Sequence, residues 1–380
     1  CTDVDDFMWN NKDYLILFAA GNAGDDPGTV GYPSTAKNLV CVGGSDNVPN
    51  IENMYVSSSR GPVATSNRMS PTLTAPAIDT SENPDGLHSA DNQTNPSSRH
   101  CGIAVDNWQG TSMACPAVAG MAALVRQYFM DGYYPSGAPS GGDAFTPSAA
   151  MMKAVLVNGA VNMTGDPADR PSNDQGWGRI HMDDVLYFTG DTENLIVFDE
   201  TTGVTHGNTE THNITVADTG TPVKITLVWT DQASNNLVND LDLVLTGNGF
   251  TYYGNNFSGG WSNTSTTRDR DHVEECIFIN SGVLTTGSYT ISVEGYNIPS
   301  GEGPSTNRQP YALVVSGGIG PLGTPTPTPT GPTPTFTPSP TPTDTPTCNV
   351  YDLFVMDNDC SGSTVNLSTC DPDSIGQTIG

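Results

Sequence analysis

Residues 110–120 read GTSMACPAVAG and describe a tight turn that opens a helix. Gly110 allows a second backbone segment to approach closely, because it has no Cβ. Pro116 lacks a backbone N–H, which a helix tolerates only in its first turn, so the pattern predicts a helix that begins close to Ser112. The free N–H groups and the dipole of a helix N-terminus favour negative charge. Ser112 therefore stands where a nucleophilic serine would be useful, and an N-capping serine is the alternative interpretation.

Five further short motifs occur in a fixed order around this stretch. They are AAGN at residues 19–22, YPS at 32–34, SRGP at 59–62, LTAP at 73–76 and QGWGRI at 175–180. Together with residues 110–120 they resemble the landmarks of the subtilisin-like serine proteases, the subtilases. The last motif resembles the closing segment of a branch of that family with an appended β-domain. The resemblance covers roughly residues 1–318.

The resemblance implies a serine endopeptidase that hydrolyses peptide bonds in protein or peptide substrates. It assigns Ser112 as the nucleophile that forms the acyl-enzyme. It assigns the Asn22 side chain as a hydrogen-bond donor to the oxyanion, beside the backbone N–H of Ser112. It also implies that Gly21, Ala20 and Gly110 lie against the bound peptide. A simple turn is the alternative interpretation of an asparagine beside a glycine.

The general base of such an enzyme has no counterpart in the sequence. In this family the order is Asp, His, Ser, and both the Asp and the His precede the oxyanion asparagine. Residues 1–21 contain no histidine. His88 and His100 lie in the polar stretch 79–107, where solvated loop histidines are the favoured interpretation. We therefore expect a fragment that begins inside the catalytic domain and is inactive alone.

Composition limits the partners and the compartment. The chain has 13 Lys and Arg against 41 Asp and Glu, a formal net charge of −28, which argues against binding to nucleic acid. No stretch approaches the ~20 apolar residues of a membrane helix, so membrane insertion is not expected. Three of the eight cysteines lie in residues 348–380, which indicates a disulfide-bearing module and a secreted or cell-surface protein. The oligomeric state is left open.

Changes in residue pattern along the chain predict its organisation. Residues 1–190 read as the C-terminal half of a subtilisin-like α/β domain with a three-layer parallel sheet, 191–318 as a jelly-roll-like β-sandwich, 319–347 as an extended Pro/Thr linker, and 348–380 as the start of a Cys-containing module. In the first segment we expect strands at 14–20 and 38–43, and helices at about 112–130 and 147–158, the second capped by Thr146. In the second segment we expect strands at 212–217, 223–231, 240–247, 272–281, 287–295 and 310–316.

Acidic residues in the β-rich segment suggest a metal site. Asp231, Asp240 and Asp242 fall at strand entrances with few basic residues close in sequence. Carboxylate oxygens are the ligands that Ca²⁺ prefers, so these three residues are candidate ligands for a structural Ca²⁺. A turn with Asp and Asn caps is the alternative.

Two other classes of function remain open from the sequence. One is a non-catalytic relative that keeps the fold as a binding module. The other is an extracellular adhesive or carbohydrate-binding protein, in which aromatic residues on strand faces, such as Tyr252, Tyr253 and Trp261 of the β-rich segment, would act.

Overall fold

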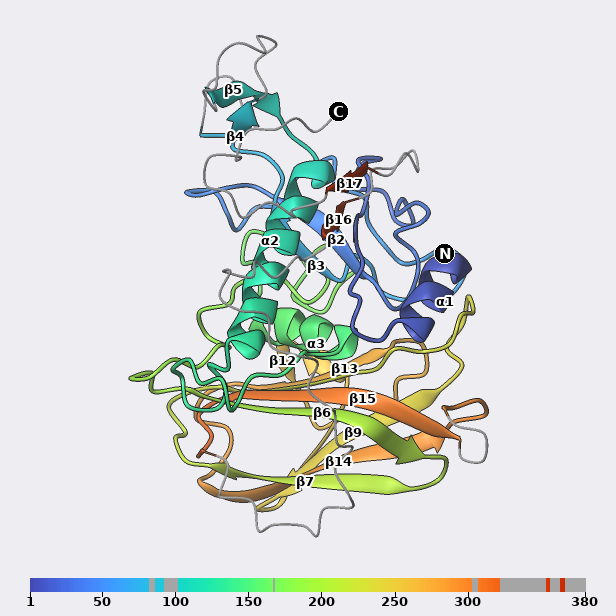
Figure 1. The fold of residues 1–380 in the computed structure, drawn as a ribbon, viewed down its shortest axis with the longest axis vertical. Coiled ribbons are helices and arrows are strands. Elements are labelled where there is room, and N and C mark those ends of the chain that lie inside the picture. Colours follow the sequence, from blue (N-terminus) through green and yellow to red (C-terminus); the bar gives the residue numbers. More distant parts are fainter. Residues whose placement is uncertain are drawn as a thin grey trace, which may run out of the picture.

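The computed structural model describes residues 1–81, 86–91, 102–166, 168–302, 307–321, 353–355 and 363–365. Its upper part in Figure 1 holds a small sheet between helices, and its lower part holds two larger antiparallel sheets. The predicted linker and C-terminal module lie almost wholly outside the described residues, so their proposed structure stays a prediction. Within the described part of the chain, none of the helices is both long and apolar enough to cross a membrane.

The upper part is built on a parallel sheet of β1 (Leu17–Ala19), β2 (Val40–Ser45) and β3 (Leu73–Pro76), in the order β1-β2-β3. All residues of β1 and β2 are buried, as continuous apolar runs predict. Helix α2 (Thr111–Met130) packs on one face of the sheet, and α1 (Thr2–Asn10) covers the other face through Met8. The predicted three layers are therefore present.

Helix α3 (Ala149–Gly159) is buried along its whole length, as its apolar sequence indicates. Its N-cap is Ser148, whose hydroxyl accepts the N–H of Met151 at 3.0 Å. The prediction that Thr146 caps this helix is therefore wrong by two residues.

The lower part contains two four-stranded antiparallel sheets with a shared core of aliphatic and aromatic side chains. One sheet has the order β13-β8-β15-β6, from β6 (Asn194–Thr205), β8 (Val223–Val228), β13 (Glu274–Ile279) and β15 (Arg308–Gly317). The other has the order β10-β9-β14-β7, from β7 (Thr209–Val216), β9 (Asp240–Gly247), β10 (Phe250–Tyr253) and β14 (Gly287–Asn297). All six predicted strands overlap observed ones, whereas β6 and β10 are not predicted.

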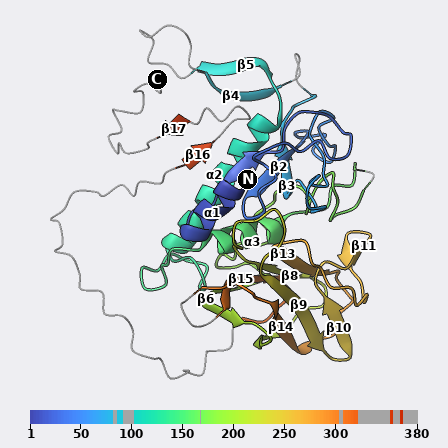
Figure 2. The ribbon, with the colours of Figure 1, turned by 90° about the vertical axis from the view of Figure 1, so that its right-hand side faces the viewer.

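Three short hairpins complete the described elements. They are β4 (Leu87–Asp91) with β5 (Gly102–Trp108), β11 (Phe257–Ser258) with β12 (Trp261–Ser262), and β16 (Leu353–Val355) with β17 (Ser363–Val365). The β4–β5 hairpin lies beside the N-terminal end of α2 in both ribbon views (Figure 2).

The two parts meet along α3 through a common hydrophobic cluster. Helix α3 packs between α2 and the sheet that contains β8 and β15. Val228 of β8 and Val314 of β15 belong to the same hydrophobic cluster as Val155 of α3. The sheet of β8 and β15 therefore completes the packing of the upper part, while the two lower sheets also enclose a core of their own.

Candidate active site

The nucleophile candidate lies at the start of α2, where β3 and the helix meet. Gly110 caps the helix with φ +136° and donates its N–H to the carbonyl of Ala77, just past β3, at 2.8 Å. Ser112 is the second residue of the helix and is exposed. Among the residues that the structure describes, neither its N–H nor its hydroxyl has a hydrogen-bond partner. Pro116 lies in the second helical turn rather than the predicted first turn.

Asn22 follows the carboxyl end of β1 and reaches this helix start. Its Oδ1 accepts the Thr111 N–H at 2.9 Å and the Thr111 hydroxyl at 3.2 Å. The Nδ2 group is thereby left as the outward donor, and it makes no hydrogen bond within the described part of the chain. A Cβ at position 110 would lie 3.2 Å from this Nδ2, so Gly110 makes room for the Asn22 side chain rather than for the backbone segment that the sequence predicts.

Two hydrogen-bond donors and one hydroxyl come together at this helix start. Within the described part of the chain, the Asn22 Nδ2 and the Ser112 N–H have no acceptor, and the Ser112 side chain is exposed. Both stand at a helix N-terminus, where the dipole favours negative charge. Donors that are already oriented stabilise a developing oxyanion strongly, because they need no reorganisation during the reaction.

The predicted substrate-contacting residues mainly shape this site. Gly21 donates its N–H to Thr111 Oγ1 at 3.1 Å, and its carbonyl accepts the Ser59 N–H at 2.9 Å. Ala20 is 1% exposed and donates to the carbonyl of Val42. The backbone groups of Gly21 thus serve the fold, and contact of Gly21, Ala20 and Gly110 with a peptide stays a prediction.

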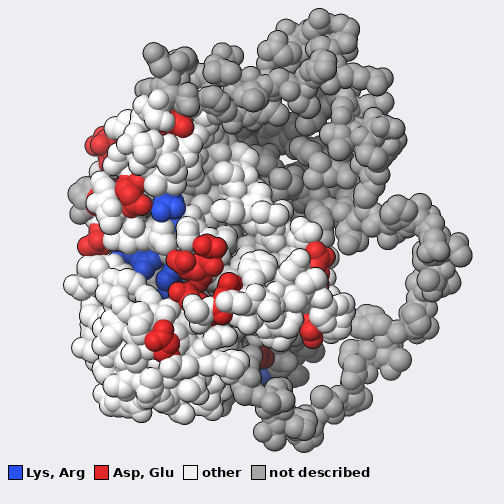
Figure 3. Space-filling view, turned by 90° about the vertical axis from the view of Figure 1, so that its left-hand side faces the viewer, with Lys and Arg blue, Asp and Glu red and all other residues white. Residues whose placement is uncertain are grey.

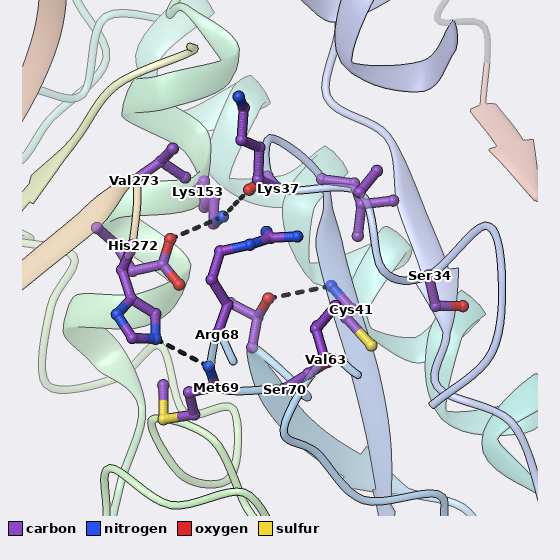
Figure 4. Close-up of a pocket in the computed structure, with 14 residues that line it drawn as sticks. Ser34, Lys37, Cys41, Val63, Arg68, Met69, Ser70, Lys153, His272 and Val273 are labelled. Carbon is purple, nitrogen blue, oxygen red and sulfur yellow. Dashed lines mark hydrogen bonds and ion pairs between the residues drawn. The ribbon is translucent and has the colours of Figure 1, made fainter. Parts of the chain in front are cut away.

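One hydrogen-bonded Asp–His pair resembles a catalytic base, but its acceptor nitrogen is occupied. His272 Nδ1 lies 2.8 Å from Asp269 Oδ2, while its Nε2 accepts the backbone N–H of Met69 at 2.8 Å. His272 lines the joint between the two parts (Figure 4). The side chains of His88 and His100 lie outside the described residues.

The three acidic residues proposed for Ca²⁺ do not form one cluster. Asp231 pairs with Lys37 at 2.9 Å, with both side chains fully buried. Asp240 and Asp242 instead share Arg270, at 3.2 and 2.7 Å. The face in Figure 3 likewise shows basic side chains next to acidic ones. Across the described residues, no group of three or more His, Cys, Asp and Glu side chains is arranged to hold a metal ion. Ca²⁺ binding stays a prediction.

The basic partners of these carboxylates are not identified from the sequence, because the partners are distant from them in the chain. Lys37 comes from the upper part, far from Asp231 in the chain, and Arg270 lies in the loop before β13. Burial, reinforced by Asp242 and Asp269 and opposed by Arg270, raises the pKa of Asp240 to about 7. The Asp240 carboxyl therefore keeps its proton to a higher pH than an exposed aspartate does.

Comparisons with known proteins agree with the motifs. The profile of the subtilase family matches residues 1–178. The chain is 28% identical over 305 residues to "Serine protease/ABC transporter B family protein tagD" of Dictyostelium discoideum, which covers 66% of this chain and 17% of that protein. It is 31% identical over 226 residues to "Serine protease/ABC transporter B family protein tagA" of the same organism, which covers 55% of this chain and 12% of that protein.

The chain thus spans less than a fifth of the length of these relatives, 17% of the first and 12% of the second. Among solved structures, sphericase aligns with a TM-score of 0.33 and 22% identity, over 47% of this chain and 51% of that chain. Residues 1–178, slightly less than half of the chain, thus match the subtilase family.

Proposed function

We propose that this chain supplies the nucleophile and the oxyanion site of a serine endopeptidase. The observation that carries the proposal is the pair of free donors, Asn22 Nδ2 and Ser112 N–H, beside the exposed Ser112 hydroxyl. The curated relatives, whose names include "serine protease", support the same reaction class.

The reaction follows from this geometry. Ser112 Oγ attacks the carbonyl carbon of the scissile peptide bond, and its proton passes to a general base. The carbonyl oxygen becomes an oxyanion, which Asn22 Nδ2 and the Ser112 N–H stabilise. The C–N bond then breaks, and the leaving amine takes the proton from the base. Water attacks the acyl-enzyme by the same route and releases the acid.

Among the described residues, no base forms a hydrogen bond with Ser112. A serine hydroxyl is a weak nucleophile until a base takes its proton. We propose that a histidine and its orienting aspartate come from polypeptide outside these 380 residues, and that residues 1–380 alone are inactive. The proposed substrates are proteins or peptides, and a secreted or cell-surface location and a structural Ca²⁺ remain proposals.

Active-site labelling tests the assignment. A fluorophosphonate probe modifies a serine only when a base activates it. Residues 1–380 alone should not be labelled, whereas the enzyme completed with its own upstream polypeptide should be labelled at Ser112. Ser112→Ala should abolish labelling of the completed enzyme, while Ser136→Ala, at an exposed serine after α2, should not. Equal labelling of the Ser112→Ala protein would reject the assignment.

A further inference from the structure

The joint between the upper and lower parts holds a small polar cavity that the proposed reaction does not use. Lys37, Arg68 and Met69 line it from the upper part, with Lys153 of α3, and His272 and Glu274 line it from the lower part (Figure 4). Lys153 pairs with Glu274 at 3.0 Å and also donates to the Lys37 carbonyl at 3.0 Å. Charged side chains in this joint are therefore matched across the two parts.

His272 makes a contact of a different kind. Its Nε2 lies 2.8 Å from the backbone nitrogen of Met69, a residue 203 positions away in the chain. A backbone N–H can only donate, so Nε2 must be the unprotonated acceptor. The ring proton therefore sits on Nδ1, which faces the Asp269 carboxylate at 2.8 Å.

Asp269 is itself held in place by the loop. Its Oδ1 accepts the backbone N–H of Asp271 at 2.8 Å, and its Oδ2 accepts the Asn255 side-chain amide at 2.8 Å. Burial opposes its charge, yet the hydrogen bond from His272 lowers the pKa of Asp269 well below its usual range. The loop thus presents a fixed carboxylate to one side of the imidazole, which selects the tautomer on the other side.

We propose that Asp269 and His272 form a tautomer-selective clamp that fixes the lower sheets to the segment ahead of β3. The carboxylate holds the ring proton on Nδ1 and so keeps Nε2 free to accept from Met69. Met69 lies four residues before β3. The clamp therefore links the loop before β13 to the segment that leads into the parallel sheet of the upper part. Asp269 and His272 are positioning residues in this role, since neither touches the proposed nucleophile.

The clamp is tested first on the wild-type chain of 380 residues. Nitrogen-15 NMR at pH 8 distinguishes a protonated from an unprotonated ring nitrogen. The proposal predicts a His272 with a proton on Nδ1 and an unprotonated Nε2, and slow hydrogen exchange at the Met69 amide. A proton on Nε2 would overturn the proposal without any variant being needed.

Asp269→Asn then changes the tautomer at nearly constant size. The new amide donates to Nδ1, so the ring proton moves to Nε2 and the contact with Met69 is lost. Exchange of the Met69 amide should become roughly tenfold faster. Unchanged exchange together with a proton on Nε2 would show that the contact does not hold the joint.

Two substitutions of His272 separate the two halves of the clamp. In His272→Gln, the side-chain oxygen reaches the place of Nε2 and should keep the Met69 amide protected. In His272→Asn, the shorter amide reaches only Asp269, so exchange should quicken as in Asp269→Asn. His206→Ala is the matched control, because His206 Nδ1 accepts the Ile298 N–H within the lower part alone. Met69 protection lost equally in His272→Gln and His206→Ala would reject the clamp.

Discussion

Thr111 and Asn22 are joined twice, because both the N–H and the hydroxyl of Thr111 donate to the same amide oxygen of Asn22. The Thr111 hydroxyl also accepts the N–H of Gly21 at 3.1 Å. The side chain of Asn22 therefore cannot turn its oxygen outward without losing both bonds. Its NH₂ group is therefore the end that is left free of Thr111, and the residue before the proposed nucleophile is what orients it.

Thr111→Val should weaken catalysis in the completed enzyme. Valine keeps the shape of threonine and the backbone donor but removes the hydroxyl that links Gly21 to Asn22. The Asn22 amide would be held by one bond instead of two, so we expect kcat to fall by about tenfold with KM nearly unchanged. Thr111→Ser keeps the hydroxyl and should retain most of the rate. Steady-state kinetics on a peptide substrate decides this, and an equal loss in both variants would contradict it.

Asn22→Ala should lower kcat much more than it raises KM, because the amide contacts charge that exists only in the transition state. Removal of one oxyanion donor typically costs about 10²–10³ in kcat. Asn22→Asp is the sharper variant, since the carboxylate can still accept from Thr111 but cannot donate to the oxyanion. It should lose at least as much rate as Asn22→Ala. A kcat within threefold of wild type in either variant, roughly 0.7 kcal/mol, would remove Asn22 from the site.

How much the sequence predicts depends on how local the cause is. The buried strands β1 and β2 follow from continuous apolar runs, and the helix start at Thr111 follows from Gly110 and its neighbours. The α3 cap is missed because Asp199 of β6, a distant residue, binds both the N–H and the hydroxyl of Ser148. Strand β6 is missed because Asp199, Glu200 and a glycine interrupt its apolar pattern.

The same reasoning explains the site residues. Asn22 and Ser112 are visible in the sequence because each lies in a short motif. The partners of Asp231 and of His272 are invisible, because Lys37 and Met69 come from the other part of the fold. Thr111 stands in the nucleophile motif, yet its bonds to Asn22 appear only when β1 and α2 are brought together.

Lys153→Met should strongly destabilise the whole chain. Lys153 is 2% and Glu274 7% exposed in their side chains, so the substitution leaves a buried carboxylate without its partner. Breaking one half of such a pair costs about 3–5 kcal/mol of unfolding free energy. Lys153→Met combined with Glu274→Gln removes the unpaired charge and should recover part of that loss. Urea unfolding of residues 1–380 measures both, and a single variant no less stable than the double variant would contradict the argument.

Asp240→Asn should become increasingly stabilising as the pH rises. The folded-state pKa of Asp240 is about 7, against about 3.9 in an unfolded chain. Between these values the folded protein keeps a proton that the unfolded chain releases, so the wild type loses stability as the pH rises from about 4 to about 7. Asparagine has no proton to release, and its Tm advantage over wild type should grow across that window.

A matched control for this titration is Asp218→Asn. The hydrogen bonds from Thr221 and the Gly220 N–H lower the pKa of Asp218, which is the opposite direction. This variant should therefore lose stability relative to wild type as the pH rises through the lower range. If the two variants show the same pH dependence of Tm, the burial of Asp240 does not control its titration.

The Ca²⁺ proposal predicts that Arg270 and the metal compete for the same carboxylates. Arg270 contacts both Asp240 and Asp242, so an added cation gains little until that side chain is removed. In Arg270→Gln the two carboxylates repel each other, and a ligand that binds only the folded chain raises its stability with the logarithm of its free concentration. Millimolar Ca²⁺ should therefore raise the Tm of Arg270→Gln more than that of wild type, relative to EDTA.

Mg²⁺ should act more weakly, because it demands a tighter octahedral shell. Arg270→Gln combined with Asp240→Asn should lose the effect. If Tm in Ca²⁺ equals Tm in EDTA for both wild type and Arg270→Gln, Asp240 and Asp242 bind no Ca²⁺.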